Sequence, residues 1–461
     1  LVVFFQKSNI IFIYKTALLK YMSKENVKIE ESSSKSKQNI SKQKSEKKSE
    51  NISKNKSEKK SDKKQFYHWT DVAAEKIIRE KGDKDSYTVA AGITPSGTVH
   101  IGNFREIITV DLVKKALERR GKIVRFIYSW DDFDVFRKVP KNMPKQKELE
   151  SELRKPIVDV SDPHEKAESY ARHHEIMVEE DVVRVGIKPE FIFQSKEYRK
   201  GKYAKEMKHA LENKDKIIKT LNAYRKEPLA DDWLPVSVFS EKFGDDKIKN
   251  LRWDGNWSLS YELEDSTVET VNFQKGGNVK LKWRVDWPMR WAFEKVDFEP
   301  GGKDHSTTGG SFDTGKQICQ EVWDHDAPTY VMYDFITVRG VGGKMSSSKG
   351  DVITLRNVLE VYEPEVIRYL FAGTRPNREF SISFDTDVLA LYEEFDRVER
   401  IYFGLEKVNE KKTEQNRVAY ELSFIGEIPK TIPYQPSLRH LTTLIQIYNF
   451  DIDKVIGYFE K

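Results

Sequence analysis

Residues 86–103, SYTVAAGITPSGTVHIGN, combine a short apolar strand, a turn rich in Thr, Pro and Gly, and the start of a helix. We predict that this helix runs from about Asn103 to Arg120 and that a second apolar strand, IVRFIYSW, follows at 123–130. A strand, a helix and a strand in this order form a β-α-β unit, whose two strands pair in parallel. In such sheets ligand chemistry takes place at the carboxyl ends of the strands.

The alternation of strands and helices continues along the chain. A helix is expected at about 164–185, a third strand, EFIFQS, at 190–195, and a further strand, YVMYDFITV, at 330–338. A helix at the start of the folded part, behind a cap at Thr70 or Asp71, is also expected.

The pattern changes at two places. Short strands and turns rich in Trp, Gly and Asp at about 231–279 indicate an insertion, and from 386 to 461 the apolar residues recur at helical spacing. We therefore predict an α/β fold. A Rossmann-like, doubly wound parallel sheet at 66–385 carries the insertion, and an α-helical domain follows at 386–461.

The first 65 residues differ in composition from the rest. Between Ser32 and Lys64 there are 12 lysines and four acidic residues, so this stretch carries +8 in a chain whose net charge is +5. It contains almost no apolar residues, and we expect the Lys/Ser-rich tail at 31–65 to be disordered. Two interpretations stay open: a solubilising tail, or a polycation that binds a nucleic-acid backbone without reading its sequence.

Residues 1–21 are apolar, but three lysines interrupt them and leave no run that could span a membrane. Because Met22 begins a polar sequence, we expect translation to start there. The single cysteine, Cys319, excludes a disulfide framework and a thiolate zinc cluster. A reducing compartment, the cytoplasm, is the natural location.

The turn after the first strand ends in His100-Ile101-Gly102-Asn103 and leads directly into a helix. An imidazole, free backbone N–H groups and the positive end of a helix dipole then surround one point. This arrangement favours the binding of an anion such as a phosphate.

A second motif, GGKMSSSKG at 342–350, follows a later strand of the same sheet. It places two cations, Lys344 and Lys349, and three serine hydroxyls on a glycine-rich loop. Cations held over a phosphate site stabilise the charge that develops on a departing pyrophosphate.

Together these motifs resemble the HIGH and KMSKS signatures of class I aminoacyl-tRNA synthetases. The segments GITPSGTVHIGNFRE, SWDDFDVFRKVP, KLKWRVDWPMRW, DFEPGGKDH and KMSSSKG look like the class I lysyl-tRNA synthetases, from about Phe66 to the end of the chain. The resemblance implies ligation of L-lysine to tRNA(Lys) through a lysyl-adenylate, with ATP and Mg²⁺, by a cytoplasmic monomer that binds no membrane.

The resemblance also implies the residues that handle ATP. The expected catalytic residues are His100, Asn103, Lys344, Ser346 and Lys349. The expected ATP-binding residues are Pro95, Gly97, His100, Gly102, Asn103, Lys344, Met345, Ser346 and Ser348. The second Lys of KMSKS is Ser347 here, and Lys349 is the candidate to supply its charge.

Lysine recognition requires acceptors for two ammonium groups, because an unpaired buried ammonium is very costly. By the resemblance, Asp132 receives the α-ammonium. For the ε-ammonium, Glu106 is the first candidate and Asp286 the second. The expected wall of the lysine stem is Trp283, Trp287, His305 and Tyr333, with the backbone of Gly92 and Thr94 nearby. Specificity for glutamate or glutamine would require a cation in place of Glu106 or Asp286.

Two departures from the family pattern favour a rival interpretation. First, the insertion has no Cys, so no structural zinc is expected and no residue is assigned as a metal ligand. Second, the α-helical cage with which the family reads the anticodon is shortened here. The rival is a synthetase-derived RNA-binding or regulatory protein without aminoacylation. The presence of His100, Asn103, Lys344 and Ser346 favours catalysis.

Overall fold

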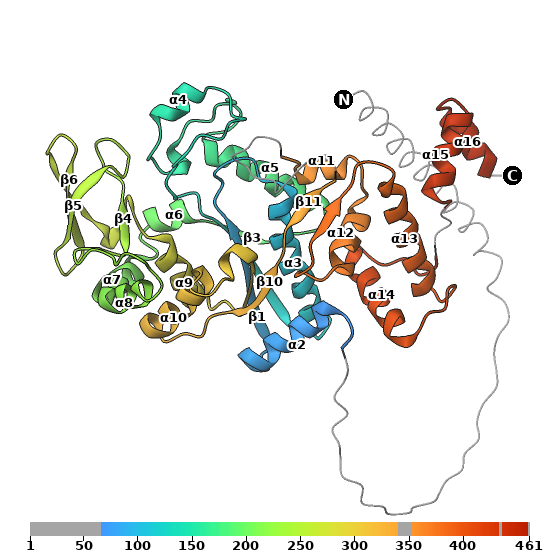
Figure 1. Ribbon diagram of the computed structural model, residues 1–461, viewed down its shortest axis with the longest axis horizontal. Coiled ribbons are helices and arrows are strands. Elements are labelled where there is room, and N and C mark those ends of the chain that lie inside the picture. The colour runs from blue at the N-terminus through green and yellow to red at the C-terminus, as the bar shows by residue number, and fades with distance from the viewer. Residues whose placement is uncertain (1–65, 340–351, 433–435, 460–461) are drawn as a thin grey trace, which may run out of the picture.

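The computed structural model describes residues 66–339, 352–432 and 436–459. At its centre lies a five-stranded sheet of order β10-β9-β1-β2-β3, in which every pairing is parallel (Figure 1). The strands are β1 (Ser86–Ile93), β2 (Ile123–Trp130), β3 (Glu190–Phe193), β9 (Phe298–Gly302) and β10 (Thr329–Tyr333). The direction of winding reverses between β1 and β9, so the predicted doubly wound fold is confirmed.

Helices cover both faces of this sheet: α2 (Trp69–Lys81), α3 (Ile101–Glu118), α9 (Trp283–Glu294) and α10 (Ser311–Trp323). Successive residues of a strand point to opposite faces. Accordingly, Val89 of β1 packs in one apolar cluster with α2 and α3, whereas Ala90 packs in another with α9 and α10. Burial on both faces explains why Val89, Ala90 and Ala91, in the middle of β1, are all apolar rather than alternating with polar residues.

The crossover from β2 to β3 contains α4 (Gln146–Ser151) and α5 (Tyr170–Arg184), and α6 (Gln194–Arg199) follows β3. The helix predicted from 164 begins later, at Tyr170. The side chain of Asp162 accepts hydrogen bonds from the backbone N–H groups of His164 (3.0 Å), Lys166 (2.8 Å) and Ala167 (2.9 Å), which holds this stretch in a turn. The helix then starts behind Ser169, whose Oγ accepts from the N–H of Arg172.

The first helix also has a different cap from the one expected. His68, rather than Thr70 or Asp71, precedes α2, and its side chain accepts the N–H of Thr70. His68 Nε2 lies 3.0 Å from the carbonyl oxygen of Ala372, so the ring joins this helix start to the C-terminal half of the chain.

The region of the predicted insertion forms antiparallel strands, as its short apolar runs indicate. They are β4 (Val236–Val238), β5 (Ile248–Trp253), β6 (Ser258–Leu263), β7 (Val268–Asn272) and β8 (Val279–Leu281). Its apolar cluster also takes in α7 (Ala204–Glu212) and α8 (Lys214–Asn222), which precede the predicted boundary. The division into domains stays a prediction.

The strand predicted at 330–338 is broken in two. β10 ends at Tyr333, and β11 (Ile336–Val338) pairs instead with β12 (Phe380–Ile382). The buried Arg105 causes the break, because its Nη1 donates to the carbonyl groups of Asp334 (2.9 Å) and Phe335 (3.0 Å) and turns them out of the sheet.

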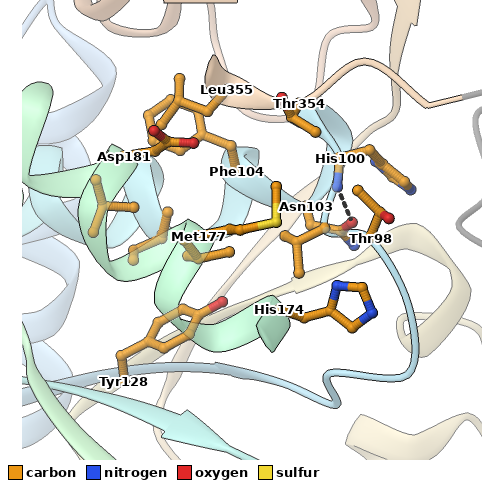
Figure 2. A pocket seen from close by; sticks show the side chains of 14 residues that line it. Thr98, His100, Asn103, Phe104, Tyr128, His174, Met177, Asp181, Thr354 and Leu355 are labelled. Atoms are coloured by element: carbon orange, nitrogen blue, oxygen red, sulfur yellow. Dashed lines mark hydrogen bonds between the residues drawn. The ribbon is translucent and has the colours of Figure 1, made fainter. Parts of the chain in front are cut away.

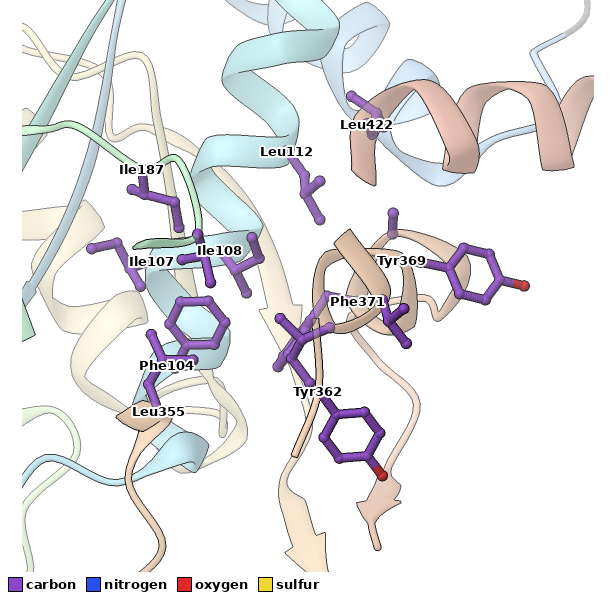
Figure 3. Packing of buried hydrophobic residues seen from close by; sticks show 14 of the residues in the cluster. Phe104, Ile107, Ile108, Leu112, Ile187, Leu355, Tyr362, Tyr369, Phe371 and Leu422 are labelled. Carbon is purple, nitrogen blue, oxygen red and sulfur yellow. The ribbon is translucent and has the colours of Figure 1, made fainter. Parts of the chain in front are cut away.

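Helices follow to the end of the described chain: α11 (Leu355–Leu359), α12 (Pro364–Gly373), α13 (Asp387–Tyr402), α14 (Glu410–Ser423), α15 (Leu438–Ile447) and α16 (Ile452–Phe459). Phe104 and Leu112 of α3 pack in the same cluster as Tyr362 and Phe371, so the central helix is shared between the sheet and the C-terminal helices (Figure 3). Within the described ranges, no helix is both long and apolar enough to cross a membrane.

A fully buried guanidinium fixes this junction. Arg368 of α12 donates from Nη2 to Oδ2 of Asp111 at 2.7 Å, and it also donates to the carbonyl groups of Leu422 and Val185. One side chain therefore ties α12 to α3, to the end of α14 and to the turn before β3. Because Asp111 is itself buried, loss of the cation leaves an unpaired charge in the core.

We expect Arg368→Met to lower the free energy of unfolding by about 3–5 kcal/mol, the usual cost of removing one partner of a buried ion pair. Urea unfolding followed by circular dichroism measures this loss. The control is Arg400→Met, because Arg400 is largely exposed and lies 3.5 Å from Glu406; this change should cost about 1 kcal/mol or less. Equal losses in the two variants would contradict the assignment.

Candidate active site

The N-terminus of α3 is built from the predicted turn His100-Ile101-Gly102-Asn103, which we call the HxGN turn. His100 precedes the helix, and its backbone N–H donates a hydrogen bond of 3.2 Å to Oδ1 of Asn103 (Figure 2). A Cβ on Gly102 would meet the His100 ring at 2.8 Å, so glycine is required for the imidazole to lie against the first helical turn. The remaining N–H groups of this turn and the helix dipole could hold an anion.

The segment after the second motif is fixed to the same turn. The N–H of Ile101 donates a hydrogen bond of 2.8 Å to the carbonyl of Ile353. Thr354 lines, together with His100 and Asn103, a cavity of about 30 Å³ against α5, which has room for one water molecule and none for a nucleotide (Figure 2). The predicted residues of the second motif itself lie outside the described residues: Lys344, Met345, Ser346, Ser348 and Lys349.

A larger cavity, of about 500 Å³, lies at the carboxyl ends of β1, β2 and β10, and we call it the switch-point cavity. Eight of the residues predicted from the sequence line it: Gly92, Thr94, Gly97, Asn103, Glu106, Trp283, His305 and Tyr333. Asn103 lines both cavities, so the anion site and the large cavity are adjacent.

Glu106, on the second turn of α3, reaches the end of β1. Its Oε1 accepts the N–H of Gly92 at 3.0 Å, and its Oε2 accepts the hydroxyl of Tyr333 at 2.6 Å. Desolvation raises the pKa of Glu106 to about 7, although both hydrogen bonds oppose the rise. Both donors are neutral, and Glu106 has no ion pair with a described residue.

The other two carboxylates of the cavity are already neutralised. Asp131 Oδ1 accepts a hydrogen bond of 2.8 Å from Nη1 of Arg290. Asp134 Oδ1 accepts from Nζ of the buried Lys280, and its Oδ2 accepts from Oγ1 of Thr94 at 3.0 Å. Although burial opposes ionisation, Lys280 holds the pKa of Asp134 below its ordinary value. Glu106 is therefore the one lining carboxylate without a cationic partner in the described chain.

Aromatic rings form one wall. Trp283 lies at the start of α9, with its ring centroid 5.5 Å from that of His305 and 5.5 Å from that of Trp287. Trp287 stands behind this wall, and its Nε1 donates to Oε1 of the buried Glu299 at 3.1 Å. Flat apolar rings next to a carboxylate suit a ligand with an aliphatic stem and a cationic end.

Comparison with known proteins identifies the family. Residues 67–425 match the model of a family described as tRNA synthetases class I (K). The chain belongs to this family. It is similar to proteins named lysine--tRNA ligase from Borreliella burgdorferi (52% identical, covering 86% of this chain and 75% of the relative), Treponema pallidum (50%, 85% and 75%) and Thermococcus kodakarensis (48%, 86% and 75%).

Some residues that the family resemblance singled out do not line the switch-point cavity. The Asp132 carboxylate accepts both the N–H and the hydroxyl of Ser195, and Asp286 accepts the hydroxyl of Tyr198 and lies 3.2 Å from Arg290. Both side chains are buried below the cavity. Trp287, Pro95 and Gly102 are also absent from its lining, and His100 lines the smaller cavity instead. A direct contact of Asp132 or Asp286 with lysine therefore has no support from their positions.

Sequence reasoning missed seven residues of this class I synthetase that line the cavity: Ile93, Ser96, Val99, Tyr128, Asp131, Asp134 and Arg137. Asp131, Asp132 and Asp134 all follow β2 within the run WDDFD. The alternation of side chains along β2 was the available signal for which of these Asp side chains face the cavity. Trp130 is fully buried in the α2 and α3 cluster, and the chain turns immediately after it.

We expect Tyr333→Phe to raise the pKa of Glu106 further above about 7, because the phenol hydrogen bond favours the ionised carboxylate. Nuclear magnetic resonance of ¹³C-labelled glutamate side chains during a pH titration measures the shift.

The matched control is Tyr330→Phe, because the hydroxyl of Tyr330 pairs with Ser306 rather than with Glu106. A Glu106 titration that is the same in Tyr333→Phe and in the parent protein would contradict the proposed hydrogen bond.

Proposed function

We propose that this class I synthetase ligates L-lysine to tRNA(Lys) through a lysyl-adenylate. The observation that carries the proposal is Glu106, a carboxylate without a cationic partner beside an aromatic wall, one helical turn from the HxGN anion site. This arrangement provides an acceptor for an ammonium group next to a site for phosphate.

In the proposed complex the ε-ammonium of lysine pairs with Glu106, and its aliphatic stem lies along Trp283 and His305. The α-ammonium lies at the rim formed by Asp131 and Asp134, whose carboxylates can accept a further hydrogen bond although Arg290 and Lys280 already pair with them. The lysine carboxylate then points toward the N-terminus of α3. We prefer Asp131 or Asp134 to Asp132 for this role because both line the cavity.

Adenylation requires the lysine carboxylate to attack the α-phosphorus of ATP, with a new O–P bond formed and pyrophosphate released. The chain contributes position and electrostatics rather than a covalent nucleophile. His100, Asn103 and the backbone at Gly97 would hold the phosphates at the start of α3. Lys344, Ser346 and Lys349 would neutralise the pyrophosphate, as the family resemblance implies. The bond from Ile101 to Ile353 supports this role, because it brings the described chain that follows the motif to the start of α3.

Mg²⁺ accompanies ATP and prefers phosphate oxygens and water to cages made only of protein ligands. In the ranges that the structure describes, no group of three His, Cys, Asp or Glu side chains could hold a metal ion. We therefore assign the ion to the phosphates. In the second step a ribose hydroxyl of the terminal adenosine of tRNA attacks the carbonyl carbon of the lysyl-adenylate. An ester bond to the ribose forms, the bond between the carbonyl carbon and the phosphate oxygen breaks, and AMP is released.

Arg137 is a further catalytic residue in this proposal. It follows β2 and lines a cavity whose other charged side chains are three carboxylates. A guanidinium would repel the ammonium groups of lysine, whereas it would stabilise the charge that develops on the α-phosphate during attack.

An aminoacylation assay over the twenty amino acids, with ATP, Mg²⁺ and a tRNA(Lys) transcript, tests the proposal as a whole. We expect lysine alone to be attached. Tight binding of tRNA without attachment of any amino acid would instead support a regulatory RNA-binding protein, and gel filtration tests the expected monomer.

Glu106→Gln should raise the lysine KM by the equivalent of roughly 2–5 kcal/mol and leave the KM for ATP nearly unchanged, because one partner of a buried charge pair is lost. In the parent protein, lysine must ionise Glu106 on binding. Since the pKa of Glu106 is about 7, lysine affinity should rise with pH up to about 7 and level off above it.

Lysine KM measured between pH 6 and pH 8.5 checks both parts. The pH dependence should be absent in Glu106→Gln. An unchanged lysine KM in this variant, combined with a large increase in Asp286→Asn, would transfer the ammonium site to Asp286.

Arg137→Gln should lower kcat for adenylate formation about 10²-fold, the usual cost of one electrostatic donor to a transition state, with a smaller change in the lysine KM. The control is Lys138→Gln, the next residue of the same loop, which is exposed and does not line the cavity. Single-turnover measurement of adenylate separates kcat from binding. Similar rates in the two variants would remove Arg137 from the mechanism.

A further inference from the structure

A second cavity of about 500 Å³ lies away from the switch-point cavity, and we call it the α2–α14 cavity. Its walls come from the start of α2, the edge strand β10, the loop after α12 and the first turn of α14. Contacts between α2 and β10 and between α12 and α14 hold these elements together. None of the residues assigned above to lysine, ATP or the HxGN turn lines it.

Three aromatic side chains line the cavity: Phe66, Tyr67 and Trp69. The rest of its apolar lining comes from Val72, Ala73, Val331, Met332 and Pro376. Trp69 Nε1 donates a hydrogen bond of 2.7 Å to the carbonyl of Ala372, and the carbonyl of Tyr67 accepts from Gln415 at 3.0 Å. The guanidinium carbon of Arg120 lies over the Phe66 ring, 5.0 Å from the ring centroid. These aromatic residues are therefore held in place before any ligand arrives, which lowers the entropic cost of binding.

Three cations complete the lining: Lys76, Arg375 and Lys411. Arg375 and Lys411 are exposed, and Lys411 lies in the first turn of α14, where the helix dipole adds positive potential. No lining residue is Asp or Glu. The switch-point cavity differs, because three carboxylates line it and two of them are paired with buried cations.

An anionic ligand with a flat apolar part fits this lining. A nucleotide has both features: a base that stacks on aromatic rings, and a phosphate that pairs with Lys and Arg. A volume of about 500 Å³ lies in the range of small-ligand sites. An acidic peptide would use the cations but not the concave aromatic wall, so the lining favours a nucleotide.

We propose that the α2–α14 cavity binds an unpaired nucleotide of tRNA. The assignment rests on the proposed function for the identity of the RNA. The cavity joins elements of the sheet domain to α14 of the C-terminal helices, so one bound nucleotide contacts both parts of the protein. The residues of the α2–α14 cavity lie outside the lysine and ATP sites. They contribute to tRNA affinity and not to lysine activation.

The test measures binding of a tRNA(Lys) transcript to the full chain over a range of KCl concentrations. Lys411→Glu and Arg375→Glu should each weaken binding about fivefold at 0.1 M salt and reduce the slope of log affinity against log salt by about 0.7, the value for one phosphate of a single strand. Lys412→Glu is the matched control, because it makes the same charge change one residue further along α14, outside the cavity.

A second variant tests the aromatic part without altering charge. Val72 lines the cavity and is 52% exposed, so Val72→Trp fills the space with little effect on folding. It should weaken tRNA binding about fivefold or more, the effect of losing one stacked base, and leave the salt slope unchanged. A thermal melt confirms that each variant is folded.

Equal losses of tRNA affinity in Lys411→Glu and Lys412→Glu would overturn the proposal, and so would unchanged tRNA affinity in Val72→Trp. A third contrary outcome is that the parent protein binds AMP, and that Val72→Trp abolishes AMP binding but leaves tRNA binding unchanged. The last would assign the cavity to a free nucleotide. Lysine binding, followed by calorimetry, should be the same in all variants. A parent protein that binds tRNA through this cavity but does not bind lysine would refute the proposed function and leave this inference standing.

Discussion

The parallel pairing of β1 with β2 is the constraint on which the site depends. The register runs from Ser86 opposite Ile123 to Ile93 opposite Trp130, so both strands end at the same level. The chain therefore turns at Thr94 and at Asp131 along one edge of the sheet. The N–H of Asp131 donates to the carbonyl of Ile93 at 2.9 Å, which extends the pairing to that edge. A shift of one residue would reverse the facing of every side chain on β2 and remove both the apolar core and the cavity.

Below the switch-point cavity, charges are buried in pairs. Asp131 with Arg290 and Asp134 with Lys280 cost desolvation energy that only close pairing and hydrogen bonding offset. These pairs leave the cavity with fixed dipoles but little net charge. With a pKa of about 7, Glu106 is about half ionised at pH 7, and a bound cation would shift it toward the ionised form.

Much of this arrangement could be predicted from the sequence, because it is local. The apolar run at 86–93, the HxGN turn and the spacing of Asn103 and Glu106 within one helix all depend on residues close in the chain. Choosing between Asp131 and Asp132 could not be done in this way, because it depends on Ser195, which binds Asp132 from another strand end. The split of the strand at 330–338 depends on Arg105, more than two hundred residues earlier. Both require contacts that no local pattern records.

The paired strands at the base of the insertion determine which changes of length the fold can accommodate. β4 pairs antiparallel with β8, with Val236 opposite Leu281 and Val238 opposite Val279, so the chain leaves the body and returns to it at neighbouring points. Segments between these strands can lengthen, shorten or be exchanged as a unit, since the two ends stay in place. Lys280 sits on β8 itself and pairs with Asp134. A change of length beyond β4 and β8 would therefore leave this base in place, whereas a change on β8 would reach the switch-point cavity through Lys280 and Asp134.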